Sequence, residues 1–270
     1  MNIALTIAGS DSGGGAGIQA DLKTFEAHGV FGASVITAVT AQNTVGVQGA
    51  WPVPLEMVEQ QLQSVLSDIK VRSIKTGMLF SKEIIATVAN HLRAYDLPIV
   101  VDPVMVATSG DRLLQEDAIE ALKEELLPQA KVITPNLAEA EVLSGITIQN
   151  REDMEFAARI LKEFFPGAWI LIKGGHFEGD NQAADLLYNR EYYWMEARRI
   201  RTKNTHGTGC TLSAAIAANL AQRSGVFSAV KASKAYVHGA IKNAWRSVGK
   251  GRGSLRHNWQ AREEEDPVKD

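Results

Sequence analysis

The feature that most constrains the fold of this chain is a regular alternation between short apolar segments and longer amphipathic ones. Residues 3–9, IALTIAG, form an apolar run that ends in glycine, which is typical of a buried strand. Residues 18–29, IQADLKTFEAHG, carry apolar side chains at helical spacing and end in a glycine that can cap a helix. Further strands are predicted at 33–44, 73–79, 98–103, 130–135 and 168–175. Further helices are predicted at 54–69, 81–96, 116–127, 136–145 and 151–165, and from about Cys210 and Phe227 onward.

Alternation of this length predicts an α/β fold with a mostly parallel sheet and helices on both faces. Residues 184–189 and 191–200 are predicted to form an antiparallel pair. A chain of 270 residues is near the upper size for one hydrophobic core, and it contains no repeat and no linker-like segment. We therefore expect a single domain over residues 1–258, followed by a charged and flexible C-terminal tail at 259–270.

The composition excludes several classes of protein. A net charge of −3 gives no sign of a nucleic-acid partner or of an anionic membrane partner. No segment approaches the ~20 apolar residues of a membrane span, and the N-terminus lacks the basic start of a signal peptide. The single cysteine excludes an internal disulfide, and the six scattered histidines show no zinc-binding spacing. These features predict a cytoplasmic protein.

Glycine-rich and polar segments directly follow most of the predicted strands. The carboxyl ends of parallel strands meet at one edge of a sheet, where open α/β folds bind their ligands. We therefore expect these segments to converge on one site, which favours an enzyme over a structural protein. The segments are GSDSGGGAG, TAQNT, KTGM, DPVM, TPNLAE, KGGH and NTHGTGC.

Two common nucleotide-binding motifs do not fit the sequence. Gly15, Gly17 and Ala20 match a G-x-G-x-x-A fingerprint, but no acidic residue lies between Ala27 and Leu55 to hold a ribose. The loop from strand to helix is also too long for a Rossmann motif. The Walker A pattern GxxxxGK[ST] is absent. A dinucleotide dehydrogenase and a P-loop NTPase are therefore disfavoured.

The segment GTGC offers a different kind of phosphate site. The amides of Thr208, Gly209 and Cys210 lie at the start of a predicted helix and can form an anion hole for a transferring phosphoryl group. Gly207 and Gly209 let the backbone approach the phosphate oxygens. Small residues after the turn allow the helix to pack closely on the sheet: Ser213, Ala214, Ala215, Ala217 and Ala218. On spacing alone, Cys210 can equally be a small apolar residue at a tight helix start.

The GTGC segment, read within NTHGTGCTLSAA, resembles the C-terminal signature of the ribokinase-like sugar and vitamin kinases. Most of these kinases have an aspartate base where Cys210 stands. The cysteine variant, with the other segments in order, resembles the hydroxymethylpyrimidine/phosphomethylpyrimidine kinases of thiamine biosynthesis. The resemblance extends from about Ile3 to Gly249. It fails at the C-terminus, where GSLRHNWQ and an acidic tail replace the expected His-rich end. The matching segments are AGSDSGGGAGIQADLKTF, TAVTAQNT, KTGML, VVDPVMVATSG, TPNLAEAE and IKGGH.

The resemblance implies a ribokinase-like three-layer α/β/α sandwich and two successive ATP-dependent transfers. The first acceptor is the hydroxymethyl group of 4-amino-5-hydroxymethyl-2-methylpyrimidine, and the second acceptor is the resulting monophosphate. It also implies Mg²⁺, leaves the need for a monovalent cation open, and suggests a homodimer. The partners are thus ATP and a small pyrimidine, with no nucleic acid and no membrane.

The resemblance also assigns the residues that carry the chemistry. Cys210 takes the place of the base, and we expect the helix N-terminus to lower the pKa of its thiol. Lys173 follows a strand next to two glycines and is expected to bridge the phosphates, although it could be a surface lysine. Gly207, Thr208 and Gly209 complete the catalytic turn.

Residues that bind ATP and metal follow from the same resemblance. Asn136 and Glu139 match an NxxE motif that organises magnesium and phosphates, and their spacing also predicts a helix capping box. Asp102 is expected to help Glu139 hold the metal ion through water. His206 is expected to contact phosphate, although a lone histidine often has no special role.

The pyrimidine pocket is the last assignment. Asp21 and Gln42 match the family's pyrimidine site, and a glutamine amide offers the donor and acceptor that an aminopyrimidine edge needs. Asp21 could instead be an ordinary acid in the first turn of a helix. Gly9, Met78 and Val104 are expected to line the same pocket.

Two rival functions stay open at this point. A pyridoxal kinase has the same fold and a similar flat heteroaromatic acceptor with a hydroxymethyl group, and Gln42 and Met78 favour the pyrimidine. A vitamer-binding regulator without activity is the other rival. The intact set of Lys173, Asn136, Glu139 and Cys210 argues against a regulator, because a binding protein has no need of phosphate machinery.

Overall fold

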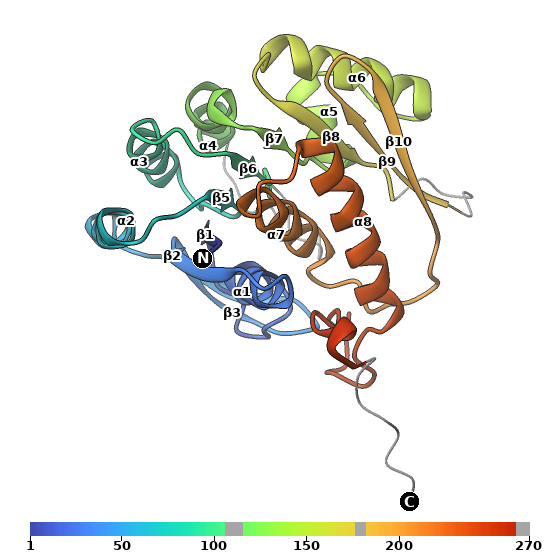
Figure 1. Ribbon diagram of the computed structural model, residues 1–270, viewed down its shortest axis with the longest axis horizontal. Helices are drawn as coiled ribbons and strands as arrows, with labels where there is room; N and C mark the ends of the chain where they lie inside the picture. Colours follow the sequence, from blue (N-terminus) through green and yellow to red (C-terminus); the bar gives the residue numbers. More distant parts are fainter. Residues whose placement is uncertain (106–115, 176–181, 263–270) are drawn as a thin grey trace, which may run out of the picture.

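A central sheet of eight strands forms the middle layer of the protein (Figure 1). The computed structural model describes residues 1–105, 116–175 and 182–262. The strand order is β10-β9-β8-β7-β6-β5-β1-β2. The parallel strands are β1 (Ile3–Ala8), β2 (Phe31–Ile36), β5 (Ser73–Thr76), β6 (Ile99–Val101), β7 (Val132–Ile133) and β8 (Trp169–Lys173). At one edge β9 (Gln182–Tyr188) and β10 (Tyr192–Arg198) are antiparallel, as predicted.

Helices cover both faces of this sheet (Figure 1). One face carries α2 (Leu55–Asp68), α3 (Lys82–Leu92), α4 (Glu116–Ala121), α5 (Leu137–Ser144) and α6 (Arg151–Phe164). The other face carries α1 (Gly17–Ala27), α7 (Thr208–Ala221) and α8 (Val226–Lys242). Strand side chains alternate between the two faces, so Leu5 and Ile7 join one core cluster while Ala4 joins the other. The fold is therefore the predicted three-layer α/β/α sandwich.

Helix α7 packs directly on the sheet through small, buried side chains. Residues 213–218 are all fully buried. The hydroxyl of Ser73 on β5 donates a hydrogen bond of 2.7 Å to the carbonyl oxygen of Ala217, so sheet and helix backbone are separated by one small side chain. This close packing confirms the role predicted for the small residues and brings the start of α7 to the end of the sheet.

The prediction of one strand over 33–44 is wrong, because this segment forms two strands. Strand β2 ends at Ile36, and β3 (Ala38–Gln42) leaves the main sheet to pair antiparallel with β4 (Val47–Pro52). Thr37 marks the change of direction, with its N–H donating to Ala8 O (3.1 Å) and its hydroxyl to Met78 O (2.7 Å). Apolar periodicity cannot show such a change, since both strands are β-branched and apolar.

Two further differences concern the ends of elements. The helix predicted at 116–127 is regular only in α4, and a wide π turn at Leu122–Leu126 follows it. At the C-terminus, residues Trp259–Arg262 form a 3-10 turn, and Trp259 packs against Tyr236 of α8. The folded unit therefore extends past residue 258, while residues 263–270 of the predicted tail lie outside the described residues. In the described part of the chain, no helix has the length and apolarity to cross a membrane.

Candidate active site

A cavity of about 770 Å³ opens at the carboxyl ends of the parallel strands. Each of the polar segments that follow the strands contributes to its wall, together with the turn that begins α7, so the predicted convergence is confirmed. Asp21 and Thr208 are the two predicted site residues that do not line it. The predicted residues that line it are Gly9, Gln42, Met78, Asp102, Val104, Asn136, Glu139, Lys173, His206, Gly207, Gly209 and Cys210.

The GTGC turn is held in a conformation that requires glycine. Gly207 precedes α7 with a φ of 81°, which side chains rarely adopt, and its carbonyl accepts from the N–H of Thr211 at 2.9 Å. The N–H and the hydroxyl of Thr208 both donate to Thr205 O, at 3.3 and 2.7 Å. The amides of Gly209 and Cys210 follow in the first turn of α7, where a helix offers no acceptor of its own. Of the three amides predicted to form the anion hole, that of Thr208 already has an acceptor, so the prediction is limited to the amides of Gly209 and Cys210.

Replacing Gly207 with alanine is expected to lower stability by about 2 kcal/mol or more, because a Cβ would overlap with the carbonyl of Gly15 at a positive φ. Urea unfolding measures the change. Gly225→Ala is the matched control, since nothing lies within 4 Å of a Cβ at that position. Equal stability of the two variants would contradict the tight contact between the two turns.

Cys210 lies half-buried at the start of α7, where the amide of Gly17 at the start of α1 also faces its sulfur. Burial raises the pKa of this thiol to about 11, and the nearby Lys75 and the Gly17 amide only partly oppose the shift. The expectation that the helix N-terminus lowers the thiol pKa is therefore wrong. Removal of water from the sulfur is the larger effect, so the free thiol is protonated at neutral pH.

Lys173 forms an ion pair directly beside the GTGC turn. Its Nζ lies 2.9 Å from Oδ1 of Asp102, and a Cβ added to Gly209 would lie 3.4 Å from Nζ. Thr134 and Ser213 also donate to the Asp102 carboxylate, both at 3.2 Å. Burial alone would lower the pKa of Lys173, but the Asp102 and Glu139 carboxylates raise it above its ordinary value. A permanent positive charge thus lies next to the two free amides.

Asn136 and Glu139 form the predicted capping box at the start of α5. The side chain of Asn136 accepts from Glu139 N and the side chain of Glu139 accepts from Asn136 N, both at 2.9 Å. The N–H of Met105 donates to the other Glu139 oxygen at 3.2 Å. Burial raises the pKa of Glu139, although the positive charge of Lys173 opposes the shift. The predicted capping box is confirmed, and both residues also line the cavity, while their predicted role toward magnesium and phosphates stays a prediction.

The carboxylates at this end of the cavity fit a metal ion only through water. Among the residues that the structure describes, no group of three or more His, Cys, Asp or Glu side chains could enclose a metal ion. Asp102 and Glu139 already accept hydrogen bonds on both carboxylate oxygens. Mg²⁺ that arrives with a nucleotide keeps several waters and needs few protein ligands, so these two acids suit it as acceptors for its waters.

The residues predicted to form the pyrimidine pocket, apart from Asp21, line the same cavity. Gly9 donates its N–H to Met78 O at 3.0 Å, and a Cβ at Gly9 would overlap with the Met78 side chain. Val104 has a φ of 42°, a strained value for a β-branched residue. Gln42, the last residue of β3, also lines this cavity. The structure brings these predicted residues together.

Asp21 lies below the cavity and not in its wall. It is fully buried in α1, and one carboxylate oxygen accepts from Lys75 at 2.8 Å and from Thr6 at 2.6 Å. Burial alone would lower the pKa of Lys75, but Asp21 raises it above its ordinary value. The predicted pyrimidine contact of Asp21 is therefore corrected to a buried ion pair beneath the site. The sequence signal that was missed is Lys75, a charged residue inside an otherwise buried strand.

The divergent C-terminal segment contributes to the site as well. Lys250, Gly251 and Arg252 line the cavity beside the turn between β3 and β4. The N–H of Gly251 donates to the Thr44 hydroxyl at 3.1 Å, and the N–H of Arg252 donates to Thr44 O at 2.8 Å. Sequence reasoning found no role for these residues, because they are far from the other motifs along the chain.

A lysine and helix-start amides in the wall of one cavity at the carboxyl ends of the strands are the arrangement expected of a small-molecule kinase with an α/β/α fold. The chain belongs to the phosphomethylpyrimidine kinase family, whose model matches residues 11–256. It is 54% identical to the hydroxymethylpyrimidine/phosphomethylpyrimidine kinase of Rhizobium meliloti (strain 1021) over 258 residues, which are 94% of this chain and 96% of the relative.

Solved structures confirm the ribokinase-like fold. The phosphomethylpyrimidine kinase of Clostridium difficile 630 superposes with a TM-score of 0.79 at 43% identity, over 89% of this chain and all of that one (100%). The pyridoxal kinase of Staphylococcus aureus, in complex with AMP-PCP and pyridoxal, gives a TM-score of 0.89 at 37% identity, over 97% and 95% of the two chains.

Proposed function

We propose that this protein transfers the γ-phosphoryl group of ATP first to 4-amino-5-hydroxymethyl-2-methylpyrimidine and then to its monophosphate, in thiamine biosynthesis. The observation that carries the proposal is that Lys173, the first turn of α7 with Gly209 and Cys210, and Gln42 all line one cavity. The name of the Rhizobium relative and the family description support the pyrimidine as acceptor. A relative from Geobacter sulfurreducens is named as a thiamine biosynthesis protein, which supports the pathway.

In this proposal, the chain's own groups position the reactants and balance charge. The Gln42 amide binds the aminopyrimidine edge, and Gly9, Met78 and Val104 hold the ring. The acceptor hydroxyl then lies near Cys210. Its oxygen forms the new bond to phosphorus, the bond to the ADP oxygen breaks, and the hydroxyl proton passes to the thiolate form of Cys210.

In this proposal, the residues around Lys173 stabilise the phosphoryl group during its transfer. Lys173 and the amides of Gly209 and Cys210 face the phosphoryl oxygens, with His206 beside them. Glu139 and Asp102 would accept hydrogen bonds from the waters of a Mg²⁺ ion that arrives with the nucleotide, and this ion would supply charge neutralisation on the nucleotide phosphates. Replacement of the monovalent cation in the assay tests separately whether the enzyme requires one.

Phosphorus NMR of the products tests this proposal. With ATP, Mg²⁺ and the hydroxymethylpyrimidine, we expect a phosphomonoester signal first and a diphosphate signal later. A monoester that accumulates without diphosphate would limit the activity to the first step. Tight pyrimidine binding without consumption of ATP would instead support a regulator.

A pyridoxal kinase activity has one specific observation in its favour. The Staphylococcus aureus pyridoxal kinase superposes on nearly the whole chain, and its acceptor is also a flat ring with a hydroxymethyl group. We propose that pyridoxal is at most a secondary acceptor here, because Gln42 and Met78 suit the aminopyrimidine edge.

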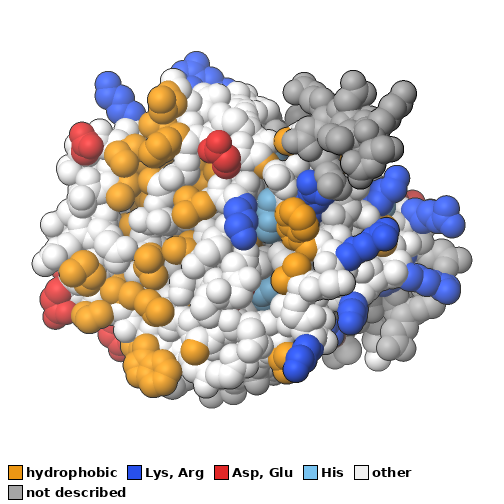
Figure 2. All heavy atoms as spheres, turned by 90° about the horizontal axis from the view of Figure 1, so that it is seen from below, with side chains coloured by type: hydrophobic (Ala, Val, Ile, Leu, Met, Phe, Trp, Pro, Cys, Tyr) orange, Lys and Arg blue, Asp and Glu red, His pale blue; other side chains and the backbone are white. Residues whose placement is uncertain are grey.

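We also propose that the protein is a homodimer. The small sheet of β3 and β4 exposes large apolar side chains, with Val39 and Trp51 at 55% and 69% exposure. Figure 2 shows a broad apolar area on the face that is lowest in Figure 1, where β3 lies. Exposed apolar surface of this extent is typical of protein interfaces. Light scattering of the purified protein measures the oligomeric state, and a monomer at micromolar concentration would contradict the proposal.

A further inference from the structure

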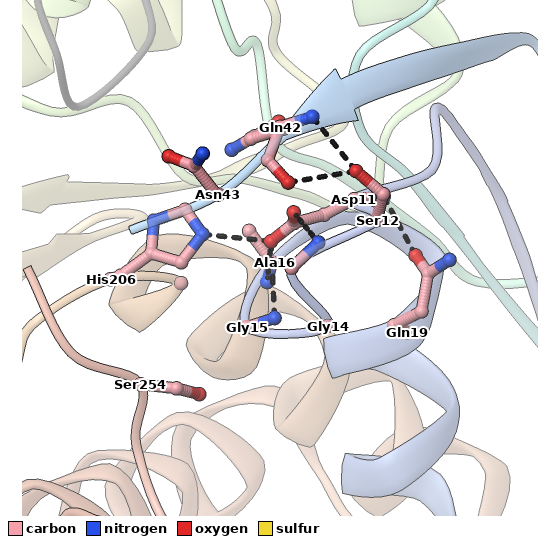
Figure 3. Close-up of polar contacts among 12 residues, drawn as sticks. Asp11, Ser12, Gly14, Gly15, Ala16, Gln19, Gln42, Asn43, His206 and Ser254 are labelled. Atoms are coloured by element: carbon pink, nitrogen blue, oxygen red, sulfur yellow. Dashed lines mark hydrogen bonds and ion pairs between the residues drawn. The ribbon is translucent and has the colours of Figure 1, made fainter. Parts of the chain in front are cut away.

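The glycine-rich loop after β1 is organised by a single buried carboxylate. Asp11 is 1% exposed, and Figure 3 shows its carboxylate at the centre of the loop. Oδ1 accepts from Gly13 N at 2.8 Å, and Oδ2 accepts from Gly15 N at 3.0 Å and from Ala16 N at 2.8 Å. These bonds are local and would by themselves give Asp11 a structural role in the loop.

The same carboxylate also reaches the GTGC turn. Nε2 of His206 lies 2.7 Å from Oδ2 of Asp11 (Figure 3). Because a carboxylate only accepts hydrogen bonds, Nε2 carries the proton that it donates. Burial alone would raise the pKa of Asp11, but the hydrogen bonds from His206, Ala16 and Gly13 lower it below its ordinary value. Asp11 is thus ionised, and it binds two turns that are 195 residues apart in the chain.

The two turns also fit together through their glycines. A Cβ at Gly15 would lie 2.6 Å from Cδ2 of His206, and a Cβ at Gly207 would overlap with the Gly15 carbonyl. On its far side, His206 is fixed by its backbone N–H, which donates to Gly253 O at 3.1 Å. The two turns therefore cannot move far relative to each other without breaking the hydrogen bond between Asp11 and His206.

The opposite side of the same loop holds the strand that carries Gln42. The hydroxyl of Ser12 donates to Gln42 O at 2.7 Å and accepts from Gln42 N at 2.8 Å. The hydroxyl of Ser10 accepts from Thr40 N at 3.1 Å. Figure 3 shows Ser12 and Gln42 on one side of Asp11 and His206 on the other. The loop therefore connects the backbone of Gln42 at the end of β3 with His206 at the GTGC turn.

We propose that Asp11 and His206 form a positioning pair that holds the GTGC turn in register with Gln42. This inference rests on the proposed function, because it assumes that Gln42 binds the acceptor. The pair keeps the acceptor hydroxyl aligned with the phosphoryl group, so that transfer to the acceptor is favoured over transfer to water. Neither residue needs to touch the reacting atoms for this role.

The variants Asp11→Asn, His206→Leu and His206→Gln test the pair. We expect Asp11→Asn and His206→Leu each to lower kcat with the pyrimidine by about thirtyfold, with little change in the KM for ATP. The ratio of ADP released to pyrimidine phosphate formed should rise above one. Glutamine places a nitrogen donor near the position of Nε2, so His206→Gln should recover most of the activity and a ratio near one.

A double-mutant cycle makes the test specific to the pair. The variant with both Asp11→Asn and His206→Leu should be little worse than either single variant, because each single change already breaks the contact. His91→Gln and His91→Leu are controls, since His91 bonds to Thr87 O in α3 and does not line the cavity. Thermal unfolding of each variant checks that the fold is retained.

Three outcomes would overturn the inference. These are wild-type kcat in Asp11→Asn and His206→Leu, a loss of activity with the ADP ratio unchanged at one, and additive effects in the double variant. A wild-type protein that phosphorylates no pyrimidine would contradict the proposed function, on which this inference rests, whereas an active wild type with unchanged kcat in Asp11→Asn and His206→Leu would overturn the inference alone. The two failures are therefore distinguishable in one set of assays.

Discussion

Replacement of Lys173 by methionine is expected to lower kcat with the pyrimidine acceptor by about a thousandfold. The Nζ of Lys173 is the positive charge nearest to Gly209, and its side chain is only 16% exposed. A charge that is largely shielded from solvent interacts with phosphoryl oxygens far more strongly than a charge in water does. Methionine keeps the length and most of the packing of the side chain but removes the charge. The decrease in kcat therefore measures the electrostatic stabilisation that the charge provides.

Steady-state assays with ATP and Mg²⁺ measure this effect. Lys162→Met is the control, since Lys162 is a hydrogen-bonded lysine of α6 that does not line the cavity. It should retain the kcat of the wild type. A loss of less than about tenfold in Lys173→Met would show that the lysine is only the partner of Asp102 and has no part in the transfer.

The kcat/KM of the wild-type enzyme is expected to rise roughly tenfold per pH unit between about pH 7 and about pH 9. The reason is the pKa of about 11 that burial gives to the Cys210 thiol. Below this pKa the thiol is protonated, so the thiolate that accepts the proton is a minor form whose fraction grows tenfold per unit. The slope should flatten only as the pH approaches the thiol pKa.

Substitution of Cys210 separates this effect from other titrations. Cys210→Ala should lower kcat/KM at pH 8 by about a hundredfold or more and remove the slope. Cys210→Ser should also lose the slope, because a serine hydroxyl does not ionise in this range. A wild-type profile that stays flat from pH 7 to pH 9, or a slope that persists in Cys210→Ala, would remove Cys210 from the role of base.

The sandwich could be predicted because its determinants are local. The segment Ile3–Ala8 is apolar with a glycine after it, and the small residues of α7 follow one another in the sequence. The departure of β3 from the main sheet could not be predicted in this way. It depends on the hydrogen bonds of Thr37 to Ala8 and Met78, which are contacts between segments that are distant in sequence.

The site shows the same division between local and long-range information. Residues at strand ends, such as Lys173 as the last residue of β8 and Asp102 directly after β6, could be predicted to meet because strand ends share one edge of the sheet. The burial of Asp21 against Lys75 and the high pKa of Cys210 follow from the depth of these groups in the fold, which spacing does not encode. The hydrogen bond between Asp11 and His206 joins two glycine-rich segments, and neither segment by itself indicates a contact with the other.

The most direct test of the whole account compares acceptors with the wild-type enzyme. ADP release is measured with ATP and Mg²⁺, first with hydroxymethylpyrimidine, then with its monophosphate, then with pyridoxal. We predict that both pyrimidines turn over and that kcat/KM for pyridoxal is lower by about a hundredfold, which corresponds to about 2.7 kcal/mol. A higher kcat/KM for pyridoxal would leave the phosphate site intact but would contradict the pocket assigned to Gln42 and Met78.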